Sequence, residues 1–331
     1  MSTARTVLVP VVSLVASLSF AAAGAACGNG GTSRACGVCT AYGDPVVAGN
    51  VNTPAVNELS GIAASKKYDD VYYVQDDDPV PFDGLDVSVH AIDDTGALIA
   101  SWQLDGARVG NLEDIAVGPC PQGTCVYTGD IGNNSGDASP YPIYRFPEPA
   151  IDRNAPPASS LISDYETIWV EYPDGGPHDC EAMAVRPDTG DIYLIEKKTG
   201  STAGVFHVPP WPAAAATGSS PTLTMTKVAD LSLVPDGTTP EDQLVTGADF
   251  HPCEPRMLVH TYSHAYEYTL PAGATDFEDI FRTAPVKVRN PGGSESIGYL
   301  WDGNGYLSVP EGQNPPLTVV RCAPDLDAGT Q

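Results

Sequence analysis

The sequence predicts an all-β fold, a β-propeller of five blades with four antiparallel strands each, and three observations support this prediction. Five segments repeat one pattern, in which a short apolar strand starts at a polar residue and is followed by a turn and a second apolar strand. The 33 glycines and 31 prolines provide many turns around an ordinary apolar content of 42%. No segment has a convincing helical period, which argues against alternating strands and helices.

The first strands of the five repeats have related sequences. They read ELSGIAAS, NLEDIAVG, DCEAMAVR, LVTGADFH and GSESIGYL, and they begin at residues 58, 111, 179, 244 and 293. The partner strands read VYYVQ, VYTGD, IYLIE, MLVHT and YLSVP, and a third strand follows each pair. A repeat of roughly 50 to 70 residues has the length of one four-stranded sheet. We therefore expect one blade per repeat, with surface loops in the Pro-, Ala- and Ser-rich segments 147–164 and 209–221.

A propeller closes its sheets radially, and other all-β architectures arrange the same short strands differently. A β-solenoid fits less well because its repeats are shorter than these. A large β-sandwich is the main alternative. A sixth, degenerate blade is also compatible with the sequence.

The N-terminus has the three parts of an export signal. Arg5 precedes an apolar run over residues 7–20, and small residues lead up to Cys27. Cys27 has the position of a lipid-modified cysteine, so a lipoprotein and an ordinary cleaved signal are both open. The expected location is the periplasm, the outer membrane or the extracellular space. The expected organisation is an export signal at 1–26, a cysteine-containing segment at 27–50, one propeller domain at 51–325 and a tail at 326–331.

Eight cysteines in an exported chain favour disulfides over metal thiolates. Cys120 and Cys125 flank a predicted hairpin turn and are expected to pair. Cys253 lies in a turn at the end of its blade opposite the acidic residues described below. Cys322 ends a strand of the next blade at that same end, so we expect these two to pair as well. A zinc site at the CxxC of residues 36–39 is disfavoured because the chain has no second CxxC. The partners of three cysteines stay open: Cys36, Cys39 and Cys180.

The formal charge of −26, from 42 acidic and 16 basic residues, argues against a nucleic-acid partner. Membrane contact is expected only through a lipid anchor at Cys27, and the chain is expected to be a monomer. Such acidity either keeps an exported protein soluble or gathers carboxylates into a cation site. The positions of the acids distinguish these two explanations.

Alignment of the first strands places three glutamates in one column. Glu113, Glu181 and Glu295 share this column with Ser60 and Thr246. In a propeller the innermost strand of each blade lines the central channel. The column therefore predicts three carboxylates at one mouth of the channel.

The partner strands bring two more acids to the same mouth. Because the second strand of a blade runs antiparallel to the first, Asp130 and Glu196 end where the first strands begin. Carboxylates this close repel one another unless a cation neutralises them. Calcium tolerates irregular oxygen ligands, so we expect one central calcium ion on Glu113, Glu181 and Glu295 with Asp130 and Glu196 behind them. The alternative is that these acids cap strands or pair with nearby lysines and arginines.

A reaction at this mouth would need a base beside the metal. The candidates are His178, His264, Asp130 and Glu196, and a metal-activated water would attack a phosphoester or a carboxylic ester. The sequence contains no GxSxG elbow, HExxH motif or Walker loop. No residue is assigned a catalytic role from the sequence.

At the repeated motifs the chain resembles the SdiA-regulated propeller family and, more broadly, secreted phytase-like and esterase-like propellers. The match runs over about residues 57 to 322, through ELSG at 58–61, LEDIA at 112–116, CEAMA at 180–184, SESI at 294–297 and YLSVPE at 306–311. The resemblance implies a five-bladed fold with calcium on the pore glutamates Glu113, Glu181 and Glu295, and it implies no defined reaction. Where the family has a glycine after each pore acid, this chain has Asp114, Ala182 and Ser296.

Two functions follow from these observations. The first is an exported calcium-binding propeller of the cell envelope that hydrolyses a phosphoester or carboxylic ester at the channel mouth as a calcium-dependent hydrolase. The second is a non-catalytic propeller that binds a small molecule or a protein and uses calcium structurally. The sequence does not decide between them.

Overall fold

The structure is a computed structural model of the chain, which divides into two units, Met1–Arg34 and Ala35–Gln331. All described residues lie in the second unit: 36–53, 57–77, 86–134, 136, 139–200, 202–213, 215, 218–233, 243–292 and 295–323. The predicted export signal, Cys27 and the tail at 326–331 lie outside the described residues. Within these ranges no helix is long and apolar enough to cross a membrane.

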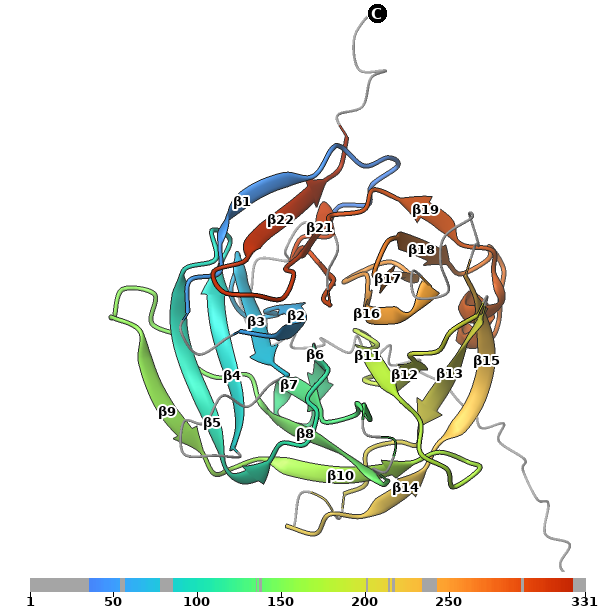
Figure 1. Cartoon of the computed structure of the whole chain (residues 1–331), viewed down its shortest axis with the longest axis horizontal. Coiled ribbons are helices and arrows are strands. Elements are labelled where there is room, and N and C mark those ends of the chain that lie inside the picture. Colours follow the sequence, from blue (N-terminus) through green and yellow to red (C-terminus); the bar gives the residue numbers. More distant parts are fainter. Residues whose placement is uncertain are drawn as a thin grey trace, which may run out of the picture. The chain divides into compact units, whose positions relative to one another are not determined.

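Five sheets surround a common centre, each with four antiparallel strands, so the predicted five-bladed propeller is confirmed (Figure 1). Blade one consists of β2 (Leu59–Ala64), β3 (Val71–Asp76), β4 (Asp86–Asp93) and β5 (Leu98–Arg108). Blade two consists of β6 (Asp114–Cys120), β7 (Gly123–Gly129), β8 (Tyr141–Pro147) and β10 (Glu166–Glu171). Blade three consists of β11 (Cys180–Val185), β12 (Ile192–Glu196), β13 (Thr202–Val208) and β15 (Thr226–Ser232).

The last two blades follow the same plan, and a short 3₁₀ helix lies in one connection. Blade four consists of β16 (Val245–Phe250), β17 (Arg256–Thr261), β18 (Ala265–Thr269) and β19 (Val286–Val288). The helix η3 (Phe277–Arg282) connects β18 to β19. Blade five consists of β20 (Gly298–Tyr299), β21 (Gly305–Ser308), β22 (Pro316–Arg321) and β1 (Val46–Asn50).

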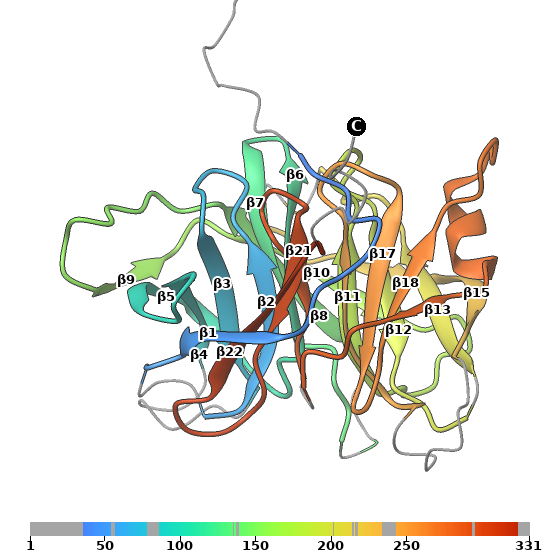
Figure 2. The same cartoon turned by 90° about the horizontal axis from the view of Figure 1, so that it is seen from above.

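Two further strands extend neighbouring blades. β9 (Ala158–Ile162) lies between two strands of blade two in the sequence, yet it pairs in parallel with β5 of blade one (Figure 2). β14 (Thr222–Thr224) likewise leaves blade three and pairs in parallel with β10. The predicted loop at 147–164 is therefore wrong at β9. The physical reason is that the outer edge of β5 presents unpaired backbone groups, with which even a polar segment can pair.

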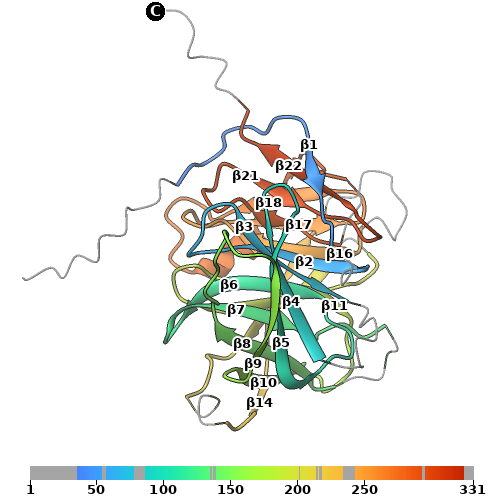
Figure 3. The same ribbon diagram turned by 90° about the vertical axis from the view of Figure 1, so that its left-hand side faces the viewer.

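The N-terminal segment completes blade five. β1 pairs antiparallel with β22, so the first and last strands of the described chain lie side by side and close the ring (Figure 3). Two disulfides attach the segment before β1, Cys36–Cys253 to blade four and Cys39–Cys322 to blade five. Closure by a terminal strand joins the two ends of the domain.

The disulfides confirm one predicted pair and correct the other. Cys120–Cys125 joins the hairpin of β6 and β7 as predicted. The predicted pair Cys253–Cys322 is wrong, because the N-terminal segment runs along the ends of blades four and five and supplies a partner to each cysteine. The backbone of the N-terminal segment is hydrogen-bonded to the end of blade five, where Ala323 N donates to Ala41 O at 2.8 Å. Cys180 is buried and forms no disulfide.

The hydrophobic core lies between the blades. Five clusters of buried apolar side chains each combine residues of two neighbouring blades. The inner strands lie so close together that a Cβ at Gly298 would be 2.6 Å from Ile62 O, and one at Gly61 would be 2.8 Å from Ile115 N. Glycine is required where two backbones approach in this way.

Two buried aspartates also link inner strands of different blades. The Asp114 carboxylate accepts a hydrogen bond from Met183 N at 2.8 Å, and the Asp249 carboxylate accepts one from Tyr299 N at 2.8 Å. Packing and hydrogen bonds thus fix the inner strands relative to one another. The side chains at the end of the channel are held in place by this arrangement.

Candidate functional site

A β-bulge sets the pore residue apart in three blades. The pairing between the first and second strands skips one residue in β2, in β11 and in β16, namely Ser60, Glu181 and Thr246. A bulge re-aims one side chain and bends the strand. All three residues belong to the column that the sequence alignment predicts. Of the other two members, Glu113 directly precedes β6, and Glu295 lies shortly before β20.

Glu113 links blades one and two. Its Oε2 accepts a hydrogen bond from Ser60 Oγ at 3.0 Å, and the residue is only 1% exposed. A Cβ at Gly132 would lie 2.2 Å from Glu113 Oε1, so glycine leaves the space that the carboxylate occupies. Oε1 itself is buried and has no hydrogen-bond partner among the described residues. A buried carboxylate oxygen without a partner is costly for the fold.

Glu181 is paired with Lys197. The Lys197 ammonium donates to Glu181 Oε1 and also lies 5.1 Å from the ring centre of Tyr262 in blade four. The second oxygen, Oε2, is buried and unpartnered within the described part of the chain. The lysine therefore compensates one oxygen of one acid. Pairing with a lysine is the alternative that the sequence leaves open, and it is also seen at Glu196, whose Oε1 lies 4.0 Å from Lys198 Nζ.

Asp77 is a fourth acid of this group that sequence reasoning did not assign. It directly follows β3, and its Oδ1 accepts a hydrogen bond from Asn111 Nδ2 at 3.1 Å. Its charge acts on both Glu113 and Glu295, which places it in the same group. We call Asp77, Glu113, Glu181 and Glu295 the acid cluster.

Burial and the charges of neighbouring acids raise the pKa of every member of the acid cluster. Burial is the largest cause for each pKa shift. At Glu113 the next largest cause is the negative charge of Glu181, and at Asp77 it is the negative charge of Glu58. The pKa rises to about 8 for Glu181, to about 7 for Glu295 and to about 6 for Asp77. Lys197 lowers the pKa of Glu181 and Glu295, but burial outweighs it. The cluster thus holds protons near neutral pH, and a bound cation would displace them.

Asp130 and Glu196 are engaged outside the acid cluster. The two carboxylate oxygens of Asp130 accept hydrogen bonds from Gly110 N at 2.8 Å and Asn111 N at 2.6 Å. Glu196 Oε2 accepts one from Gly204 N at 2.8 Å. Both acids thus bind backbone of their surroundings, because strand-end carboxylates lie next to unpaired N–H groups. Their place behind a central calcium ion stays a prediction.

The two histidine candidates also have other partners. His178 Nδ1 lies 3.2 Å from Glu196 Oε1, its Nε2 lies 3.0 Å from Asp174 Oδ2, and its ring stacks on Tyr172 at 4.0 Å. Both ring nitrogens therefore face carboxylates. His264 is 7% exposed and its ring is nearly parallel to that of Tyr266. The partners of His178 lie outside the acid cluster, and the ring of His264 packs beside Tyr266.

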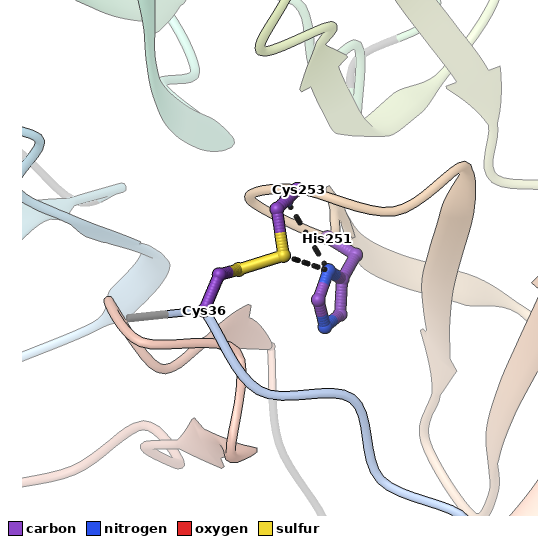
Figure 4. A group of neighbouring side chains, drawn as sticks. All are labelled: Cys36, His251 and Cys253. Carbon is purple, nitrogen blue, oxygen red and sulfur yellow. Dashed lines mark hydrogen bonds between the residues drawn. A yellow bond between two sulfur atoms is a disulfide. The ribbon is translucent and has the colours of Figure 1, made fainter. Parts of the chain in front are cut away.

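A cysteine–histidine group at the opposite end of blade four is structural. Cys36, His251 and Cys253 have potential ligand atoms mutually within 4.8 Å (Figure 4). The two sulfurs are joined in a disulfide, and His251 Nδ1 accepts hydrogen bonds from Cys253 N at 3.3 Å and Glu254 N at 3.1 Å. His251 Nε2 lies 3.3 Å from Gly303 O. All these atoms are used, so the group is not a metal site in this oxidised form.

The acid cluster has the ligand type that a hard cation prefers, but its carboxylates are widely spaced. Its donors are carboxylate oxygens, two of which are buried without partners. In the described part of the chain, only Cys36, His251 and Cys253 bring three potential ligand atoms within 4.8 Å of one another. The carboxylate oxygens of any three cluster acids are therefore farther apart than that. A cation there would bind one or two carboxylates directly and reach the others through water, which calcium readily accepts.

Comparisons with known proteins add a likeness in fold. No family model and no curated protein matches the sequence. The PQQ-bound aldose sugar dehydrogenase of Streptomyces coelicolor is similar at 14% identity, with a TM-score of 0.43 over 86% of this chain and 99% of that one. The gluconolactonase XC5397 of Xanthomonas campestris is similar at 12% identity, with a TM-score of 0.43 over 88% and 99%. At such identities neither structure assigns a family or an activity to this chain.

Proposed function

We propose that this protein is an exported, non-catalytic propeller that binds calcium at the acid cluster. The observation that carries the proposal is the pair of buried, unpartnered oxygens Glu113 Oε1 and Glu181 Oε2 in a group of four acids with raised pKa values. Lys197 is the basic residue that contacts this group. Further positive charge would relieve the repulsion that remains.

Calcium would act here as a tie between blades. The cluster residues belong to blades one, two and three and to the start of blade five, so a shared ion would join elements far apart in the sequence. Glu113, Glu181, Glu295 and Asp77 would hold it. The resemblance of the repeated motifs to SdiA-regulated and phytase-like propellers supports the same ligands.

The arrangement supports binding better than hydrolysis. A metal-dependent hydrolase needs a base beside the ion, and the candidate bases are bonded elsewhere: Asp130 to backbone, and His178 to Asp174 and Glu196. Asp130 and His178 are thus held by partners outside the acid cluster, which favours binding over ester hydrolysis at this place. Of the two functions that the sequence leaves open, binding is therefore the one proposed.

Export is the second part of the proposal. The three disulfides are typical of an oxidising compartment. Together with the signal-like N-terminus they support a periplasmic, outer-membrane or extracellular location. Labelling of Cys27 by a fatty-acid analogue in expressing cells would separate a lipoprotein from a soluble secreted protein.

Titration calorimetry of the chelator-treated mature protein tests the calcium site. We expect one equivalent of calcium to bind, with magnesium much weaker, because magnesium demands a compact octahedral site. Glu113→Gln should weaken binding by about tenfold or more. Glu171→Gln, at a half-buried acid on β10 whose Oε1 accepts a hydrogen bond from Thr224 Oγ1, is the matched control and should bind as the native chain does. Calcium binding that Glu113→Gln leaves unchanged would overturn the assignment.

A further inference from the structure

Lys197 places a cation of the chain itself inside the acid cluster. The residue directly follows β12, and its backbone N donates to Asp179 O at 2.9 Å, which fixes the main chain at the end of the strand. From there the side chain reaches the carboxylate of Glu181 on the neighbouring strand β11. The Lys197 side chain is 14% exposed. The cluster therefore holds a tethered positive charge before any metal ion binds.

The ammonium group acts on several acids but bonds to one of them. Against the larger effect of burial, its charge lowers the pKa of Glu113, Glu181 and Glu295, so it lies among three of the four cluster members. Its hydrogen bond goes to Glu181 Oε1. Glu113 Oε1 and Glu181 Oε2 stay buried without a partner in the part of the chain that the structure describes. The lysine thus neutralises only part of the cluster.

A calcium ion at the cluster would compete with this ammonium group. Both cations are attracted to the carboxylate of Glu181, and they repel each other at short distance. A divalent ion shared by several carboxylates interacts more strongly with the cluster than an ammonium group bonded to one carboxylate. Calcium should therefore replace the ammonium at Glu181 and not bind beside it.

The fold offers the displaced ammonium another contact. Tyr262 lies in the turn between β17 and β18 of the neighbouring blade four (Figure 1), and its ring centre is 5.1 Å from Lys197 Nζ. The face of an aromatic ring attracts an ammonium group. The four-carbon stem of a lysine is flexible, so the ammonium can leave Glu181 while the backbone stays bonded to Asp179. Displacement needs a rotation of one side chain only.

We propose that Lys197 is a displaceable counter-ion that sets the calcium affinity of the acid cluster. The ammonium neutralises part of the cluster in the metal-free protein and leaves Glu181 when calcium binds. The inference rests on the proposed calcium site and names the residue that determines how tightly this site binds. Because calcium binding must break the ion pair, a variant without the ammonium should bind calcium more tightly than the native protein.

Titration calorimetry with calcium on Lys197→Met and Lys198→Met tests this prediction. Both variants lose one positive charge, but the Lys198 side chain is 58% exposed and its Nζ lies 4.0 Å from Glu196 Oε1, outside the acid cluster. Lys197→Met should bind calcium about tenfold more tightly than the native protein, the equivalent of about 1.4 kcal/mol. Lys198→Met should bind as the native protein does. Lys197→Arg keeps the charge and should not bind more tightly.

The position of the ammonium can be followed independently of affinity, by NMR of protein labelled with ¹³C at the lysine ε carbon. The signals that disappear in Lys197→Met and in Lys198→Met identify the two lysines. In the native protein the Lys197 signal should shift on saturation with calcium, whereas the Lys198 signal should shift little. Thermal melting in chelator shows whether each variant is folded.

The outcomes for the lysine and for the calcium site are distinct. If the native protein binds calcium and folded Lys197→Met binds it no more tightly, the inference is overturned and the calcium site stands. Calcium binding without a shift of the Lys197 signal has the same meaning. Binding by Lys197→Met alone supports the inference, because the lysine then takes the place of the ion in the native protein. If neither protein binds calcium, both proposals are overturned.

Discussion

Single side chains at the channel mouth decide how much charge the fold must bury. Glu113 and Glu181 are 1% and 3% exposed, and each has one oxygen bonded and one without a partner in the described residues. The bonded oxygens differ in kind, since Ser60 gives Glu113 a neutral partner and Lys197 gives Glu181 a charged one. Replacing these two glutamates should therefore have different effects on stability.

Above pH 8, where Glu181 is ionised, Glu181→Gln should destabilise the metal-free protein by about 3 kcal/mol, because it leaves the Lys197 ammonium in a largely buried place without its charged partner. Glu113→Gln should have little effect or raise stability, because it removes a repelled charge and keeps the Ser60 hydrogen bond. Urea unfolding in chelator measures both. The double variant Glu181→Gln/Lys197→Met should recover most of the loss, and a Glu181→Gln protein as stable as the native one would show that the ion pair contributes nothing.

The metal-free protein should lose stability as the pH rises from 6.5 to 8. The folded pKa of Glu181, about 8, and of Glu295, about 7, both exceed the unfolded value of 4.5. Between these values the folded state holds protons that the unfolded state has released, so stability falls with increasing pH, by about 1.4 kcal/mol per pH unit for each proton held.

Thermal melting in chelator across this pH range measures the slope. Glu295→Gln should make it shallower, and saturating calcium should abolish it, because the ion displaces the protons. Below pH 6.5 a different residue acts in the opposite direction. Burial lowers the pKa of His90 to about 4, which removes stability as the pH falls from 6.5 toward 4. Equal slopes in the native protein and Glu295→Gln would count against the acid cluster.

At the scale of the elements, bulges and strand ends determine which predicted residues meet. The pore column was predictable because Ser60, Glu181 and Thr246 recur at one position of a repeated strand, and the bulge falls at that position in all three blades. The hydrogen bonds of Asp130 and Glu196 were not predictable, because the repeated strand pair does not specify where their donors lie. Gly110 and Asn111 lie in the loop before β6, and Gly204 lies on the third strand of its blade, β13.

Asp77 shows what a closer alignment could have found. It directly follows Asp76, the last residue of β3. The cysteine pairing had no comparable signal. Cys36 and Cys39 lie outside the repeats, and only the placement of β1 on β22 brings them to Cys253 and Cys322.

The three disulfides should differ in their contribution to stability. In the chain-entropy account a cross-link spanning 217 residues, as in Cys36–Cys253, stabilises by about 5 kcal/mol, whereas one spanning 5 residues, as in Cys120–Cys125, stabilises by about 2 kcal/mol. Paired Cys→Ser variants compared by urea unfolding measure this. Equal losses for the two pairs would contradict the view that the N-terminal segment closes the ring.

At the scale of the whole molecule, the sequence determined the architecture better than the site. The repeats gave the blade number, because each repeat is one sheet and each sheet must pack against its neighbours. The clusters of buried residues between blades are the physical counterpart of that repeat. Outer additions such as β9 and β14 vary between blades and have no periodic signal.

The most direct test of the calcium site is metal analysis of the mature protein together with its melting temperature in calcium and in chelator. One equivalent of bound calcium and a melting temperature that falls on chelation are the predicted result, because the ion binds the folded state and relieves repulsion in the acid cluster. Protein that contains no calcium after equilibration with it, and melts at the same temperature in chelator, would contradict the site and leave Lys197 as the cation that neutralises these acids.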